Sequence, residues 1–349
     1  MRAHTAPRPA ARDIAGPARR RPPRRARLAA LSLARAPQIL VVGLIAGTGL
    51  ASVLGRGGAW VWWLDLLAHF RIQYAALLLI SLALAAALRS RRLVIAAAAL
   101  LVLELVPLAH YAVPGDRSAA GPSLRLAHFN VLSANREHAQ VQAWVVETGA
   151  ELVFLQEVTP RWAEVLAATP NHRLIEVVAR EDNFGLAILT RDDAAVEIVE
   201  REQLEFAGLP ALAVQLRHHG RALAVLSLHT LPPLSAATSA RRDAQLVAAA
   251  QWAATQRAAG AAAVILGDFN ATPFSAALAP LTAVGLRDSL SAGGLLVAGS
   301  WPDVIWPLRI AIDHCWHDAR LVTLDRTIGP ALGSDHRPLQ VTLAWATGP

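Results

Sequence analysis

Three long apolar runs near the start of the chain restrict its possible folds more than any other feature. They cover residues 39–55, 72–88 and 93–113, and Glu104 is the one Asp, Glu, Lys or Arg inside them. Each run is close to the roughly 20 residues that an α-helix needs to cross a bilayer. A signal peptide would explain the first run but neither of the next two. The sequence therefore predicts an all-α transmembrane region over residues 37–113, with about three spans.

The positions of the arginines predict how these spans are oriented. Residues 1–36 form an arginine- and proline-rich segment with one acid, Asp13, and we expect a disordered tail there. The loop between the second and third runs reads "RSRR". Basic segments beside spans stay on the cytoplasmic side. Three spans then leave everything after Val113 outside the cytoplasm, in a multi-pass protein of the bacterial plasma membrane.

Composition adds two constraints. All the basic residues are arginine, which is typical of a GC-rich bacterial genome, and the formal net charge is +7. A nucleic-acid-binding tail would also be basic, but arginines directly before an apolar segment more often set membrane orientation. The single cysteine, Cys315, excludes an internal disulfide and a cysteine-type zinc site, and we expect a small core residue there.

The second half of the chain alternates strand and helix patterns. Residues 114–123 form a short linker of small and turn residues, and residues 124–346 are enough for one large domain. "ELVFLQEV" and "AAAVILGDFN" are typical of buried strands, and "SARRDAQLVAAAQWAATQRAAG" predicts a long helix with a glycine stop. Several strand pairs look antiparallel. We expect an α/β fold, a four-layer sandwich of two packed mixed sheets flanked by helices.

Polar side chains recur where the predicted strands end. They are Asn130, Glu157, His229, Asp268, Asn270, Asp313, Asp335 and His336. Alone, each would be a turn or capping residue more often than a catalytic one. Together they predict one pocket, rich in the carboxylate and amide oxygens that suit Mg²⁺ or Mn²⁺ better than zinc. Histidines beside such a cation suit the hydrolysis of a phosphate ester.

Five ordered motifs carry a family resemblance across the whole second domain. They are "HFNVLSAN", "FLQEV", "SLHT", "GDFNATP" and the pair "IDHCW" and "GSDHRPL". With these motifs the sequence resembles the endonuclease/exonuclease/phosphatase family, which includes pancreatic-type deoxyribonuclease, abasic-site endonucleases, neutral sphingomyelinases and inositol polyphosphate 5-phosphatases. Residues 69–108 also resemble the multi-span anchor of membrane-bound bacterial members.

The resemblance implies that three residues of the site place or bind the divalent cation. Asn130 and Glu157 match the residues that place the cation, with Glu157 as a direct ligand, and Asp335 matches a further acid on the same side.

The resemblance also implies a catalytic side. His229 matches a histidine that contacts the scissile phosphate, and Asp268 matches the acid that orients or deprotonates the attacking water. Asn270 would steady the phosphate. His336 would face it, with Asp313 holding His336 in the required tautomer.

One difference from a branch of this family narrows the range of expected activities. The abasic-site branch uses a tyrosine near the phosphate, whereas Tyr74 and Tyr111, the only tyrosines here, lie in the membrane region. We therefore expect a membrane-anchored, Mg²⁺- or Mn²⁺-dependent phosphoesterase that is not an abasic-site enzyme. Its partners would be the bilayer, through the N-terminal helices, and a nucleic acid, phospholipid head group or small phosphate ester. The alternative is a catalytically idle extracytoplasmic binding domain on the same fold.

Overall fold

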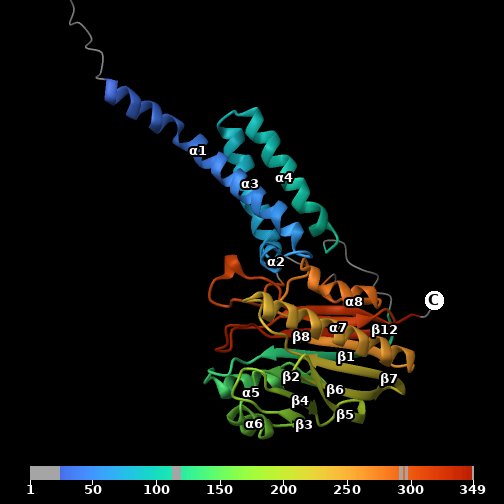
Figure 1. Ribbon diagram of the computed structural model, residues 1–349. Helices are drawn as coiled ribbons and strands as arrows, with labels where there is room; N and C mark the ends of the chain where they lie inside the picture. The colour runs from blue at the N-terminus through green and yellow to red at the C-terminus, as the bar shows by residue number, and fades with distance from the viewer. Residues whose placement is uncertain (1–23, 112–118, 291–293, 295–297, 348–349) are drawn as a thin grey trace, which may run out of the picture.

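Four α-helices form the described part of the N-terminal region. The computed structural model describes residues 24–111, 119–290, 294 and 298–347. The helices are α1 (Arg24–Leu54), α2 (Trp62–Ala68), α3 (Arg71–Ala87) and α4 (Arg91–Ala109), and they stand on one side of the second domain (Figure 1). Within the described residues, Arg35–Gly57 and Arg91–Ala109 are each long and apolar enough to cross a membrane. Helices α2 and α3, bent by 56°, make a third candidate if the pair is one span.

Glu104, the acid inside the third apolar run, is a contact between helices. It is fully buried and accepts a hydrogen bond from the Ser52 hydroxyl. Its two carboxylate oxygens also lie 3.2 Å from Nη1 of Arg56 and 3.5 Å from Nη1 of Arg71. An unpaired charge would be costly here, and two arginines on neighbouring helices compensate it. Glu104 thus joins α1, α3 and α4.

Two boundaries differ from those expected from the sequence. Helix α1 begins at Arg24, so residues 24–36 are helical and not part of a disordered tail. Alanine, leucine and arginine, which dominate this stretch, are strong helix formers, which favours a helix that starts before the apolar run. Strand β1 begins at Ala119, within the predicted linker, because it pairs with the C-terminal strand from that residue. Residues 1–23 and 112–118 lie outside the described part of the chain.

The second domain contains two six-stranded sheets. The first has the order β11-β12-β1-β2-β4-β3 and the second β5-β6-β7-β8-β10-β9. The first is made of β1 (Ala119–Asn130), β2 (Leu152–Gln156), β3 (His172–Val178), β4 (Leu186–Arg191), β11 (Leu321–Ile328) and β12 (Leu339–Ala346). The second is made of β5 (Val196–Phe206), β6 (Leu209–His218), β7 (Arg221–Leu228), β8 (Ala262–Asp268), β9 (Leu286–Asp288) and β10 (Asp313–Asp318).

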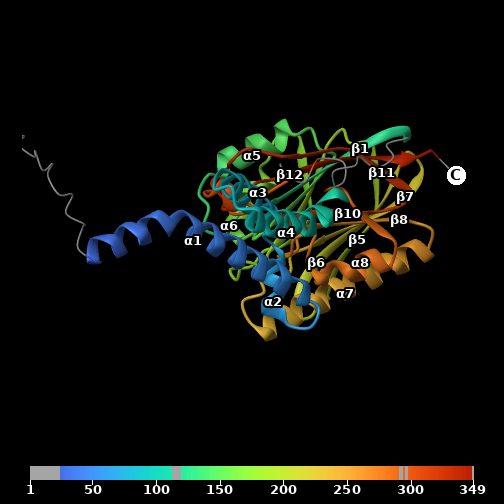
Figure 2. The same cartoon turned by 90° about the horizontal axis from the view of Figure 1, so that it is seen from above.

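The sheets pack face to face, with helices outside. Side chains alternate across a strand, so in β8 Val264 and Leu266 enter the core between the sheets while Ile265 packs on the outer side. Helices α7 (Ala236–Ala258) and α8 (Ala279–Ala283) cover the second sheet, and α5 (His138–Glu147) and α6 (Pro160–Ala167) cover the first. The predicted four-layer α/β sandwich is confirmed. Seen from above, α2 lies beside α7 (Figure 2).

The sheet topology brings four strand ends to one rim. β1 pairs with β2 in parallel, and β7 pairs with β8 in parallel. Parallel neighbours end at the same edge of a sheet, so the residues that follow them lie close together. The buried Gln156 side chain joins the two sheets there, because its Nε2 donates to the Leu228 carbonyl at 2.8 Å and its Oε1 accepts from the Asp268 backbone N–H at 3.0 Å.

Gly267 allows this close approach. Its φ is +147°, and a Cβ at this position would lie 2.0 Å from the Leu228 carbonyl oxygen. No other residue fits without moving the backbone. The residues that follow β7 and β8 are therefore held in a fixed relation to those that follow β2.

Candidate active site

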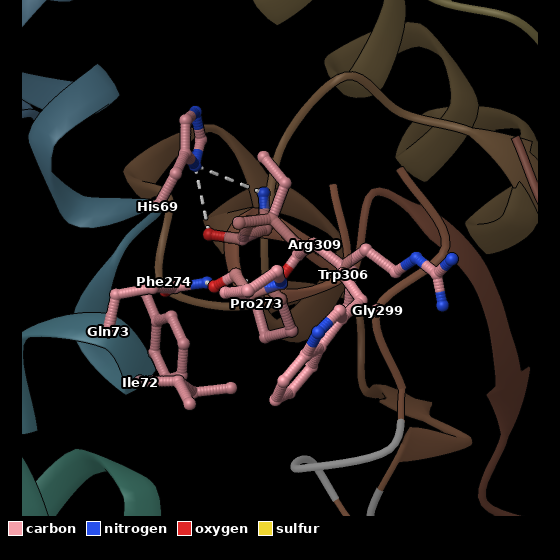
Figure 3. A pocket seen from close by; sticks show the side chains of 12 residues that line it. His69, Ile72, Gln73, Pro273, Phe274, Gly299, Trp306 and Arg309 are labelled. Atoms are coloured by element: carbon pink, nitrogen blue, oxygen red, sulfur yellow. Dashed lines mark hydrogen bonds between the residues drawn. The ribbon is translucent and has the colours of Figure 1, made fainter. Parts of the chain in front are cut away.

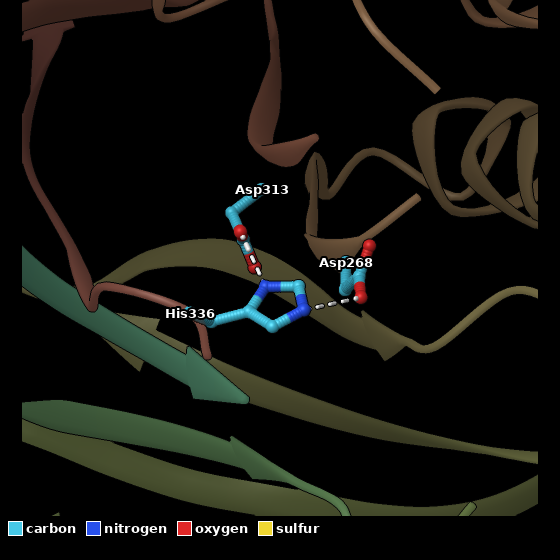
Figure 4. Close-up of side chains that lie close together, drawn as sticks. All are labelled: Asp268, Asp313 and His336. Carbon is cyan, nitrogen blue, oxygen red and sulfur yellow. Dashed lines mark hydrogen bonds and ion pairs between the residues drawn. The ribbon is translucent and has the colours of Figure 1, made fainter. Parts of the chain in front are cut away.

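A buried carboxylate–imidazole pair forms the centre of the site. Asp313, the first residue of β10, places Oδ2 2.9 Å from Nδ1 of His336 (Figure 4). Its other oxygen lies 2.8 Å from Nε2 of His128. A carboxylate bound at Nδ1 fixes the imidazole tautomer and leaves Nε2 directed at the next group. That group is Asp268, whose Oδ2 lies 3.5 Å from Nε2 of His336.

Asp268 is the point where the strand ends converge. Its Oδ2 also lies 3.6 Å from Nε2 of His229, which follows β7, and accepts from Nδ2 of Asn130 at 3.4 Å. Its Oδ1 accepts from the backbone N–H of Asn270 at 2.9 Å. The Asn270 side chain donates to the Thr230 carbonyl, also at 2.9 Å. Asn270 has a φ of +46°, an uncommon conformation of the kind that clusters at active sites.

Burial and neighbouring charges set the protonation states. Burial raises the pKa of Asp268 to about 7, although the nearby His336 opposes this. Burial disfavours the charged form of His336, but the carboxylates of Asp313 and Asp268 outweigh it and raise the pKa of His336 to about 10. Burial and the neighbouring imidazoles of His336 and His128 lower the pKa of His229 to about 3. At neutral pH one imidazole is thus charged and the other neutral.

Asp313 stays ionised for a different reason. Burial alone would raise the pKa of Asp313, but the charge of His336 and the hydrogen bonds from His128 and His336 hold it far below its ordinary value. Both of its oxygens are bonded to imidazoles. Asp313 is therefore positioned to hold both imidazoles, those of His128 and His336.

Glu157 lies beside this centre. Its Oε1 accepts from Nδ2 of Asn130 at 3.0 Å and its Oε2 from the backbone N–H of Ser133 at 3.1 Å. Its φ is +61°, so the residue that follows β2 also has an uncommon backbone conformation. Asn130 bonds both Glu157 and Asp268 and thereby fixes the two carboxylates relative to each other.

Asp335 is carried to the same rim by the loop before β12. The Ser334 hydroxyl donates to the Asn130 carbonyl at 2.7 Å, which fixes that loop to the end of β1. Oδ2 of Asp335 accepts from Nε1 of Trp301 at 3.0 Å. Its Oδ1 is buried and has no hydrogen-bond partner among the described residues. Buried polar atoms are nearly always paired, so this oxygen is a candidate ligand atom.

These donors fit a hard divalent cation. Glu157 has lone pairs beyond those that Asn130 and Ser133 use, and Asp335 has a whole oxygen unpaired. A second set, Asp268, Asp313 and His336, has ligand atoms within 4.8 Å of one another. There the oxygens of Asp313 and Nδ1 of His336 already bond each other or His128, so we interpret that set as a hydrogen-bonded catalytic group.

Three residues of the site were not predicted from the sequence. His128 and Gln156 each directly support a predicted residue, and Trp301 bonds Asp335. His128 lies two positions before Asn130 on β1, which places both side chains on the same face of the strand. That spacing was the one available signal. Cys315 is a buried core residue, as expected, and His314 bonds Asp288 and the Ala271 carbonyl.

Comparisons with known proteins agree with this fold. The family model described as "Endonuclease/Exonuclease/phosphatase family" matches residues 127–336. A family protein from Bacteroides thetaiotaomicron aligns with a TM-score of 0.55 at 18% identity over 65% of this chain and 97% of its own. A mannosyl-6-phosphatase from the same organism aligns with a TM-score of 0.53 at 18% identity, over 64% of this chain and 100% of its own. TDP2 from D. rerio, humanized by 14 mutations, aligns with a TM-score of 0.52 at 18% identity, over 63% of this chain and 98% of its own. No curated protein sequence matches the chain.

Proposed function

Because the chain belongs to the endonuclease/exonuclease/phosphatase family, whose members hydrolyse phosphoester bonds, we propose that it is a membrane-anchored, metal-dependent phosphoesterase. The observation that carries this proposal is the convergence on Asp268. Asn130 at the end of β1, His229 after β7 and His336 before β12 lie far apart along the chain, yet they direct polar atoms at one buried carboxylate. Paired buried groups whose pKa values are driven apart are typical of acid–base catalysis, which favours an enzyme over an idle binding domain.

Asp268 is the best general base for water. A carboxylate with a pKa of about 7 is partly ionised at neutral pH and basic enough to accept a proton. His336, charged below about pH 10, offers positive charge and an N–H at Nε2 to phosphoryl oxygens. His229 is neutral and donates one N–H. Asn270 holds the Asp268 carboxylate in place through its backbone.

Glu157, with Asn130 and Asp335, would hold Mg²⁺ or Mn²⁺. When bound there, such a cation supplies charge neutralisation at the phosphoryl oxygens. The basic residues 89–92 between α3 and α4 support a topology in which the N-terminus is cytoplasmic and the catalytic domain lies on the extracytoplasmic side. An alkaline phosphatase reporter fused after Pro349 tests this orientation, and an inactive reporter contradicts it.

The purified full chain tests the function directly. We expect hydrolysis of bis(p-nitrophenyl) phosphate with Mg²⁺, and DNA, RNA, phospholipid and inositol phosphates assayed in parallel define the natural ester. If no phosphoester is cleaved with Mg²⁺ or Mn²⁺ while the protein is folded by circular dichroism, the idle binding domain is the correct reading.

Asp313→Asn tests the role of the buried pair through pH. Asp313 is the largest influence that raises the pKa of His336, so its removal lowers that pKa. Protonated His336 then exists over a shorter range, and the alkaline fall of kcat/KM moves to lower pH by about 1 to 3 pH units. The acidic rise near pH 7, which follows the ionisation of Asp268, should stay within about one pH unit. An alkaline fall that does not move excludes His336 as the group responsible.

A further inference from the structure

One loop connects the catalytic centre to the membrane helices. The rim loop, residues 299–310, is fixed to the site at one end, where Trp301 bonds Asp335 and the Asp303 N–H donates to the Asp335 carbonyl at 2.8 Å. At its other end Nε2 of Gln73 donates to the Arg309 carbonyl at 3.1 Å and the Pro307 carbonyl at 3.3 Å. Gln73 lies in the first turn of α3. The rim loop is therefore held between the catalytic residues and the end of a membrane helix.

The tip of the rim loop is apolar and exposed. Val304 is 83% exposed and Trp306 76%, and Ile305 and Leu308 are about half exposed. Four consecutive or nearly consecutive large apolar side chains in water form a patch that soluble domains avoid. In Figure 1 the orange-red loop lies beside the lower ends of the blue helices, at the level of α2. The tip thus lies at the level where the apolar helices meet the catalytic domain.

A second group of aromatic residues marks the same level. Trp60 is 85% exposed and Trp63 50%, and both lie in the connection between α1 and α3. Tryptophan is enriched where a protein crosses from lipid to water. Trp306 and this connection are therefore both placed at the end of the helices that meets the catalytic domain.

The helices are fixed to the active-site loop and do not merely tether it. Asp65 of α2 is buried and accepts from the Ser275 hydroxyl at 2.6 Å and from Nη2 of Arg242 at 3.1 Å. Nδ1 of His69 lies 2.9 Å from the Thr272 hydroxyl, two residues after Asn270. The distance between the lipid surface and Asp268 is consequently set by hydrogen bonds and not by a flexible linker.

A small cavity opens between the two parts. It has a volume of about 190 Å³, and Figure 3 shows Ile72 and Phe274 on one side of it and Trp306 on another. It lies between the start of α3, the loop after Asn270 and the rim loop. Much of its lining is apolar, with Ile72, Phe274 and Trp306 among the residues that form it.

From these contacts we propose that the tip of the rim loop lies in the head-group layer of the bilayer, and that the ester cleaved is the phosphoester of a glycerophospholipid in that leaflet. In that hydrolysis the water oxygen bonds to phosphorus as one P–O ester bond breaks, and the released alcohol, either diacylglycerol or the head group, takes up a proton. The second part rests on the proposed function. The first part stands without it, since it concerns only where the tip lies. A soluble substrate would need no apolar tip beside the catalytic rim, whereas a lipid substrate requires the rim to touch the membrane.

The position of the tip is tested without any measurement of activity. The full chain carrying Val304→Cys, labelled with the environment-sensitive dye NBD, is placed in nanodiscs of phosphatidylethanolamine and phosphatidylglycerol whose acyl chains carry bromine close to the glycerol backbone, next to the head-group layer. Cys315 is fully buried and does not compete for the label. We expect strong quenching at position 304 and none for the same label at Val199→Cys, which is 59% exposed on β5 at the far side of the domain (Figure 1). Equal fluorescence with and without bromine at position 304 overturns the placement.

The substrate class is tested in nanodiscs of the same lipids without bromine, with Mg²⁺, by ³¹P NMR of the lipid phosphate. We expect Val304→Asp to slow lipid cleavage by roughly tenfold or more and to leave bis(p-nitrophenyl) phosphate hydrolysis within about twofold. Val199→Asp makes the same chemical change at the far side and should alter neither rate.

Three outcomes separate the possible failures. Cleavage of the soluble diester with intact lipid rejects the lipid substrate and leaves the phosphoesterase standing. Cleavage of DNA in preference to lipid rejects it in the same way. Failure to cleave either ester rejects the proposed function and, with it, the lipid substrate, while the fluorescence result still decides where the tip lies.

Discussion

Asp268→Asn is expected to lower kcat for phosphodiester hydrolysis by about 10²- to 10⁴-fold, the range that a positioned general base supplies. Asparagine keeps the size of the side chain and can still accept from the Asn270 backbone N–H, but it cannot take a proton from water. The loss should appear in kcat and in kcat/KM alike, because Asp268 interacts with the proton transferred from water only in the transition state. Steady-state kinetics of the detergent-purified chain measure both.

A matched control distinguishes loss of the base from loss of a buried carboxylate. Asp318 lies at the opposite end of β10 from Asp313, is 1% exposed, and pairs with Arg257 and Arg320. Asp318→Asn should lower thermal stability because it weakens two ion pairs, yet leave kcat within about threefold. If Asp268→Asn retains turnover comparable to that of the control variant, Asp268 is not the base.

The sequence was informative where strands are buried on both faces. "ELVFLQEV" and "AAAVILGDFN" contain β2 and β8, every residue of which is buried, and a short continuous apolar run is typical of a strand covered on both faces. The polar residues after such strands were therefore easy to recognise. Parallel pairing of β1 with β2 and of β7 with β8 then placed Asn130, Glu157, His229 and Asp268 at one rim.

Edge and irregular elements could not be recognised in the same way. β3 lies at a sheet edge, and after His172 its residues are half-buried or exposed with no alternation. β11 has a register shift between Thr323 and Asp325, which breaks the two-residue period that identifies a strand. The short helix α6, with its apolar residues confined to one face of about two turns, was missed as well.

The residues that support the catalytic side chains could not be predicted from the sequence for another reason. His128 acts through Asp313, which is 185 positions away, and Gln156 acts through Asp268, which is 112 positions away. Neither contact has a local signature, since each depends on how one sheet packs against the other. The contact of Asp65 with Ser275, across 210 positions, is of the same kind and joins two regions that the sequence presents as independent.

Glu157→Gln and removal of divalent cations should each nearly abolish hydrolysis. Chelation of the wild-type protein is expected to stop turnover and readdition of Mg²⁺ to restore it, because a bound cation contributes several kcal/mol of transition-state charge stabilisation. Glutamine keeps the shape and the uncommon backbone at φ +61° but removes the anionic oxygens that a hard cation prefers. The variant should therefore need at least about 10-fold more Mg²⁺ for half-maximal rate. This lies within the roughly 10- to 100-fold loss of metal affinity that follows when the surroundings of a metal ligand are changed.

Glu151 supplies the control for this prediction, since it flanks the other end of β2 and accepts from the Arg125 backbone N–H at 2.7 Å. Glu151→Gln removes the same charge from the same strand but from the edge opposite the site, so its Mg²⁺ dependence should match that of the wild type. Calorimetric titration with Mn²⁺ reports the cation site independently of turnover, and Glu157→Gln should weaken it while Glu151→Gln does not. Equal Mn²⁺ affinity in the two variants would place the cation elsewhere, with the Asp268, Asp313 and His336 group as the next candidate.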